Sequence, residues 1–233
     1  MARKKNKKND LLMKARKIIA NDNPKSPIAE QYRTVRANLQ FASVDHELNT
    51  LLVTSSGPAE GKSMTAGNIA AVFAQQGKRV LLIDADLRKP TVHHSFRLNN
   101  TKGLSNFLVG KEVLKATTQN TNVENLEVMT SGPIPPNPSE LLGSKAMSKL
   151  ILEARQTYDL LVFDTPPVLA VSDSQVLASE VDGVMLVVRS GHTDNSSAER
   201  AKELLEQSKA NILGVVLNDQ EKKNSNYYYY YGN

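Results

Sequence analysis

Short apolar runs separated by helix-like segments dominate the chain. Runs rich in Val, Ile and Leu occupy residues 50–55, 79–86, 126–132, 158–164, 183–190 and 211–218. These runs lack polar and apolar alternation, which is typical of strands covered by helices on both faces. The pattern predicts an α/β fold, in which an open, mostly parallel sheet is wrapped by helices on both sides.

Helix signals occupy the segments between these runs. Ser26 followed by Pro27 is typical of a helix start and predicts a helix over residues 26–41. A second helix follows the run at 50–55 and ends before Gly77, and a third covers residues 194–209. The length of 233 residues requires only a single domain of this kind.

Only the two ends of the chain are compositionally biased. Residues 1–17 hold eight Lys or Arg and one acid, a net charge of +7, whereas the other 216 residues carry a net charge of −2. The last stretch, NSNYYYYYGN, holds five of the seven tyrosines. We therefore divide the chain into a basic arm (1–25), an α/β domain (26–220) and a tyrosine-rich tail (221–233).

The arm has an amphipathic pattern, because one helical face collects the apolar residues Leu11, Leu12, Ala15, Ile18 and Ile19. Such a segment is suited to an anionic membrane surface, where each basic residue contributes about 1 kcal/mol. A solvated arm that binds nothing is the alternative. No stretch approaches the roughly 20 apolar residues of a membrane-spanning helix.

Composition excludes several kinds of site. The chain has no cysteine, so disulfides, thiolate metal sites and cysteine nucleophiles are ruled out, and a reducing compartment fits. The histidines lack metal-ligand spacing and are interpreted as surface or loop residues: His46, His93, His94 and His192.

The segment SGPAEGKS, residues 56–63, lies between a predicted strand and a predicted helix. That context is required of a phosphate-binding loop, whose backbone N–H groups surround the phosphates, so the predicted α/β fold is P-loop NTPase-like. Lys62 would reach the β- and γ-phosphates and Ser63 would take a magnesium position. Ser56 stands where the usual first glycine is expected. The candidate nucleotide-binding residues are Gly57, Pro58, Ala59, Glu60, Gly61, Lys62, Ser63 and Met64.

Three aspartates follow predicted strands. Asp84 and Asp86 end the run at 79–86, and Asp164 ends the run at 158–164 in the manner of a Walker B aspartate. Ligands bind beyond the carboxyl ends of such strands, and carboxylates beside a triphosphate require a divalent cation between them. We interpret these three residues, with Ser63, as magnesium ligands. A turn-capping role is the alternative for any one of them.

These motifs carry a family resemblance. SGPAEGKS, LLIDADLR, LLVFDTPP and the terminal tyrosines resemble the bacterial tyrosine kinases of capsular and exopolysaccharide systems, over roughly residues 26–231. Septum-site and plasmid-partition ATPases share the three nucleotide motifs, but their loop carries an additional lysine where this chain has Gly57. The Asp-x-Asp-x-Arg motif that ends in Arg88 and the tyrosine tail favour the kinases.

The resemblance implies a magnesium- and ATP-dependent transfer of phosphate to protein tyrosine, with ADP as the other product. Its catalytic residues would be Lys62, Asp84, Asp86 and Asp164, and Asp84 or Asp86 would accept the phenol proton. The acceptors would be the run Tyr227, Tyr228, Tyr229, Tyr230 and Tyr231, modified in trans by a neighbouring copy. An adhesive aromatic segment is the alternative reading of this run. Asn218, at the last strand end, would recognise adenine.

A further match concerns assembly. Glu30, Arg33 and Arg36 fit the family's E-x-x-R-x-x-R subunit-contact motif, and their spacing places them on one helical face. A solvated helix surface is the plainer interpretation of such a trio. The resemblance implies a homo-oligomeric ring formed through these residues.

The resemblance also implies partners. These are a separate transmembrane activator of the polysaccharide co-polymerase type, contacting residues 164–167 and 190–194, and a cognate tyrosine phosphatase. The protein would then lie in the cytoplasm, on the inner face of the plasma membrane. We expect no nucleic-acid partner, because the tail lacks a basic groove. The rival functions are a positioning ATPase on a membrane or DNA surface, and an inactive regulatory subunit, which the intact Lys62 and aspartates disfavour.

Overall fold

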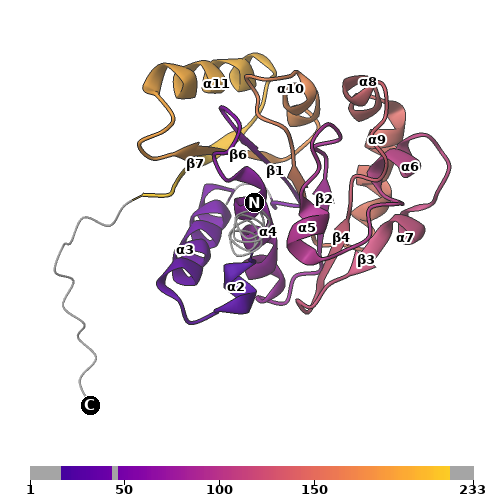
Figure 1. Ribbon diagram of the computed structural model, residues 1–233, viewed down its shortest axis with the longest axis horizontal. Coiled ribbons are helices and arrows are strands. Elements are labelled where there is room, and N and C mark those ends of the chain that lie inside the picture. Colours follow the sequence, from indigo (N-terminus) through magenta and orange to yellow (C-terminus); the bar gives the residue numbers. More distant parts are fainter. Residues whose placement is uncertain (1–16, 44–46, 221–233) are drawn as a thin grey trace, which may run out of the picture.

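The computed structural model describes residues 17–43 and 47–220 (Figure 1). The tyrosine run, His46 and most of the basic arm lie outside the described residues. The described part confirms the predicted α/β class, with a central sheet between two layers of helices (Figure 1).

The sheet has seven strands within the described residues, in the order β3-β4-β2-β5-β1-β6-β7. Adjacent strands are parallel, except for the antiparallel pair of β3 and β4 at one edge. The strands are β1 (Thr50–Ser55), β2 (Val80–Asp84), β3 (Thr118–Asn120), β4 (Leu126–Met129), β5 (Leu160–Asp164), β6 (Gly183–Arg189) and β7 (Ile212–Asn218).

The six predicted strands are confirmed, most of them shorter than the apolar runs that predicted them. Strand β3 was missed because its sequence, Thr-Gln-Asn, is short, polar and only partly buried. Strand β3 forms by pairing with β4, and its own sequence has no apolar pattern that would predict a strand.

Two groups of helices cover the two faces of the sheet (Figure 1). The first group is α2 (Ile19–Asp22), α3 (Pro27–Ala42), α4 (Lys62–Ala74) and α5 (Val92–Phe96). The second group is α6 (Leu104–Leu108), α7 (Leu114–Thr117), α8 (Pro138–Leu142), α9 (Lys145–Ala154), α10 (Asp173–Ala178) and α11 (Asn195–Gln207).

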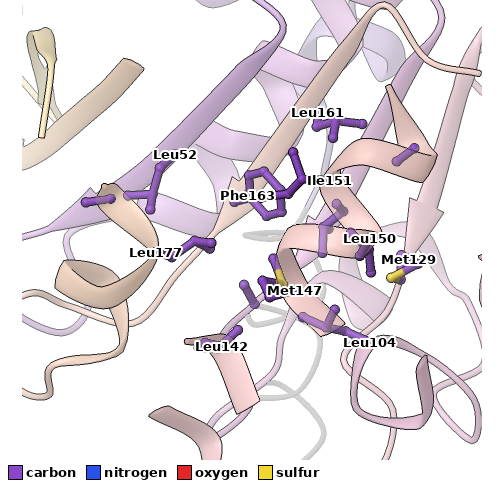
Figure 2. Packing of buried hydrophobic residues seen from close by; sticks show 14 of the residues in the cluster. Leu52, Leu104, Met129, Leu142, Met147, Leu150, Ile151, Leu161, Phe163 and Leu177 are labelled. Atoms are coloured by element: carbon purple, nitrogen blue, oxygen red, sulfur yellow. The ribbon is translucent and has the colours of Figure 1, made fainter. Parts of the chain in front are cut away.

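Strand residues alternate between two apolar cores, one on each face. Leu51 and Val53 of β1 pack with α4, whereas Leu52 between them packs on the opposite face. Figure 2 shows this second core, where Phe163 of β5 faces Ile151 of α9. Both faces of each central strand are therefore buried, which explains the uninterrupted apolar runs in the sequence.

The start of α3 is the one that the sequence predicts. The Ser26 hydroxyl accepts a hydrogen bond from the Ala29 N–H at 3.1 Å, and Pro27 occupies the first turn. Helix α4 begins at Lys62, directly after the loop SGPAEG, so the predicted phosphate-binding segment ends at a helix N-terminus.

The folded part of the chain begins before the predicted boundary at residue 26. Ile18 is 5% exposed and packs on α4, where a side chain on Gly67 would lie only 2.8 Å from the Ile18 methyl. The Ala20 N–H donates to the Asn68 Oδ1 at 2.9 Å. Ile18 therefore belongs to the core, which corrects its assignment to a membrane-facing surface of the arm.

We expect Ile18→Ala to lower the free energy of unfolding by about 2–4 kcal/mol, because it leaves a cavity against α4. Ile19→Ala is the matched control, since Ile19 is only partly buried and should lose less than half as much. Urea denaturation of the full chain measures both. Equal losses for the two variants would contradict the placement of Ile18 in the core.

Candidate active site

The register of the sheet brings two predicted site residues together. Asp84 at the end of β2 is the direct partner of Asp164 at the end of β5, and both are fully buried. Asp164 is also in register with Val53 of β1, two residues before that strand ends. The carboxyl ends of β1, β2 and β5 therefore lie side by side, next to the loop that leads into α4.

That loop presents backbone N–H groups. Gly61, the residue before α4, has φ of +94°, a left-handed conformation that favours glycine. No described side chain caps the helix, so its first N–H groups are available to an anion. A side chain on Gly61 would also lie 2.1 Å from the Asn218 Nδ2, so both backbone and space require glycine here.

Lys62 joins the loop to the carboxylates. Its ammonium lies 3.0 Å from Asp86 Oδ2 and 3.5 Å from Asp164 Oδ1, and donates to the Ser63 hydroxyl at 3.3 Å. Asp84 is held differently: its Oδ2 accepts hydrogen bonds from the backbone N–H groups of Thr91 and Val92 at 3.1 and 3.0 Å. Four predicted catalytic residues therefore form one cluster.

Burial and mutual repulsion set the charges in this cluster. Burial, followed by the neighbouring Asp164 carboxylate, raises the pKa of Asp84 to about 8. Burial also raises the pKa of Asp164, against the opposing effect of the Lys62 ammonium. For Lys62, burial alone lowers the pKa, but the surrounding carboxylates outweigh it and the net pKa is raised, so the ammonium stays charged.

The cluster has the chemistry of a magnesium site. Asp84 Oδ1 and Asp164 Oδ2 are buried and have no hydrogen-bond partner among the described residues. Unpaired carboxylate oxygens are suitable ligands for Mg²⁺, which nucleotide sites hold with one or two carboxylates plus phosphates and waters. Within residues 17–43 and 47–220, no group of three His, Asp or Glu side chains is arranged to hold a metal by itself.

The remaining predicted residues lie at different places. The Asn218 amide donates to the Glu60 carbonyl at 2.9 Å, so this side chain contacts the phosphate loop. Glu30 and Arg33 pair with each other at 2.6 Å on α3, and Arg33 also donates to the Pro24 carbonyl. Arg36 Nη1 donates to the Val72 carbonyl of α4 at 2.7 Å. Of the three residues, Glu30 is exposed, with 68% of its side-chain area accessible to solvent. Arg33 and Arg36 are partly buried.

Two features were not predicted. Arg88 of the Asp-x-Asp-x-Arg motif forms a two-point ion pair with the buried Asp173 of α10, at 2.9 and 3.0 Å. Thr193, in the loop after β6, donates to the Glu60 carboxylate at 2.6 Å. Each contact joins residues more than 80 positions apart, so no local spacing signals it.

The raised pKa of Asp84 predicts a pH-dependent stability without ligand. Between pH 4 and 8 the folded state holds this proton more tightly than the unfolded state, so stability falls as pH rises. We expect the melting temperature in metal-free buffer to fall less steeply from pH 5 to 8 in Asp84→Asn than in the original chain. Calorimetry at several pH values measures this. Parallel curves would contradict the raised pKa.

Several known proteins are similar to this chain in sequence or in fold. Residues 52–211 match a family model described as an AAA domain. The chain is 53% identical over 206 residues to the tyrosine-protein kinase YwqD of Bacillus subtilis, covering 88% of this chain and 87% of the relative. Cell-division ATPase structures such as septum-site-determining MinD of Pyrococcus horikoshii share only the fold, at 18% identity and a TM-score of 0.62.

Two solved structures are considerably more similar. The kinase domain of the Escherichia coli tyrosine kinase ETK has a TM-score of 0.85 and 40% identity, over 91% of this chain and 84% of that chain. The chimerical protein CapA2B2 also has a TM-score of 0.85, with 41% identity over 88% of this chain and 90% of that chain. The chain therefore belongs to the family of bacterial tyrosine-protein kinases.

Proposed function

We propose that this kinase uses Mg·ATP to phosphorylate Tyr227–Tyr231 on a neighbouring copy of the chain, and that it regulates capsular or exopolysaccharide production. The observation that carries the proposal is the cluster of Lys62 with Asp84, Asp86 and Asp164 at the loop before α4. It combines an anion-binding loop with the carboxylates that a magnesium-bound triphosphate requires.

The residues have distinct roles in this proposal. The backbone of residues 57–64 binds the phosphates, and the Lys62 ammonium moves from the carboxylates to the transferring group. Asp164, Ser63 and one of Asp84 and Asp86 hold the metal, which supplies positive charge against the charge on the phosphates. Asp84 or Asp86, whichever is not occupied by the metal, accepts the phenol proton as the tyrosine attacks.

Transfer in trans is the simpler geometry for these tyrosines. Asn218 ends β7 beside the phosphate loop and Tyr227 follows nine positions later, so a reaction within one chain would require this segment to cover its own site. Transfer to a neighbouring copy avoids this, and the exposed Glu30 on α3 offers a contact to that copy. Each added phosphate brings a charge of about −1.5 to −2, which favours release of the tail from the acidic site.

Three partners complete the proposal. A membrane protein of the co-polymerase type activates the kinase near residues 164–167 and 190–194, and a tyrosine phosphatase reverses the modification. Among the described residues, no helix is both long and apolar enough to cross a membrane. Residues 1–16 add positive charge suited to an anionic lipid surface.

The test is phosphate mapping by mass spectrometry after incubation with Mg·ATP, with and without the cytoplasmic segment of a candidate activator. We expect phosphotyrosine at residues 227–231, and at least about a hundredfold less in Lys62→Met, because charge stabilisation of the transferring group is lost. Phosphate release without any phosphotyrosine, in both conditions, would favour the positioning ATPase instead.

Mixing two variants, neither of which can phosphorylate its own tail, tests transfer between copies. Lys62→Met keeps its tyrosines, and a variant with Tyr227–Tyr231 all changed to Phe keeps its active site. We expect the Lys62→Met tail to be phosphorylated in the mixture and in neither sample alone. An unmodified tail in the mixture, beside normal labelling of the original chain, would mean that transfer occurs within one chain.

A further inference from the structure

Glu60 is a buried acid inside a loop that binds anions. Its side chain is 3% exposed, and no Lys, Arg or His nitrogen lies within ion-pair distance of it in the described part of the chain. Its carboxylate is instead stabilised by two hydrogen bonds, from the Ser56 N–H at 2.9 Å and from the Thr193 hydroxyl at 2.6 Å. The first of these bonds links the two ends of the loop.

Thr193 is itself fixed by its neighbours. Its hydroxyl oxygen accepts the Arg189 N–H at 2.9 Å, and its own N–H donates to the Arg189 carbonyl at 2.9 Å. Because the oxygen already accepts the Arg189 hydrogen, the hydroxyl hydrogen points to Glu60. The loop between β6 and α11 therefore presents a rigid donor to the phosphate loop.

The hydrogen bonds that connect Ser56, Glu60 and Thr193 lie outside the two apolar cores. Ser56, Glu60 and Thr193 line a cavity of about 280 Å³ that opens beside the phosphate loop. Without the Thr193 donor, Glu60 Oε1 would lose its hydrogen-bond partner within the described residues, which favours movement of the loop. Backbone groups that bind phosphates tolerate displacements of only about 0.5 Å.

We propose that Thr193 is a positioning residue, which through Glu60 holds residues 56–61 in the geometry that binds the nucleotide phosphates. The inference rests on the proposed Mg·ATP site. Since the loop contacts the phosphates before and during transfer alike, losing this support weakens ground-state and transition-state binding equally. The loss therefore raises KM for ATP and leaves kcat nearly unchanged.

The experiment compares full-length Thr193→Val, which removes the hydroxyl at constant shape, with Thr193→Ser, which keeps it. Calorimetric titration gives the Kd of Mg·ADP, and tyrosine phosphorylation gives KM and kcat. We expect Thr193→Val to raise both Kd and KM about tenfold, with kcat within about twofold, and Thr193→Ser to bind like the original chain.

Thr117→Val is the matched control, because it removes another threonine hydroxyl, bonded to the Leu114 carbonyl at 2.8 Å in α7. It should leave Kd unchanged. Thr193→Ala also removes the hydroxyl but puts no methyl group in its place. A packing defect caused by the valine methyl therefore cannot decide the result. In a Glu60→Ala background, which removes both acceptor oxygens, Thr193→Val should add little, because the two residues act through one link.

Normal Mg·ADP binding by both Thr193→Val and Thr193→Ala would overturn the inference alone. So would equal weakening in Thr193→Ser, a loss confined to kcat, or full additivity with Glu60→Ala. If the original chain retained no Mg·ADP, the proposed function would fail, and this inference with it. The two failures are therefore distinguishable.

Discussion

One ammonium group faces three buried carboxylates at the carboxyl edge of the sheet. Lys62 contacts Asp86 and Asp164, and Asp84 lies in register with Asp164 on the adjacent strand. With all four groups ionised the cluster carries a charge of −2, which is the charge that one Mg²⁺ neutralises. Burial, followed by the neighbouring Asp164 carboxylate, raises the pKa of Asp84, so this carboxyl holds its proton more tightly than an exposed one.

The sheet makes this arrangement possible. Parallel strands direct their carboxyl ends to one edge, and the order β2-β5-β1 places two aspartates and the phosphate loop side by side. Two apolar cores hold the strands rigidly from both faces, so the carboxylates cannot move apart to relieve their repulsion. The packing of the two cores thus keeps the carboxylates close together despite their mutual repulsion.

The phosphate loop is supported from the other side by residues of β6 and β7. Asn218 holds the Glu60 carbonyl and Thr193 holds the Glu60 carboxylate, so the last two strands stabilise a loop that follows the first. Arg88 and Asp173 similarly join the end of β2 to α10. Contacts of this kind connect the nucleotide site to the loops after β5 and β6, where we propose that an activator binds.

The sequence determined the fold class and located the candidate site residues that the sheet brings together. Apolar runs located the central strands, because both faces of each are buried, and the phosphate loop and aspartates were recognisable because their chemistry depends on local spacing. Tertiary structure alone decided the core position of Ile18, the pairing that creates β3, and the contacts of Glu60, Arg36 and Arg88. Each of these depends on a partner distant in the chain, and the side-chain packing and hydrogen bonds that select the partner exist only after the sheet has formed.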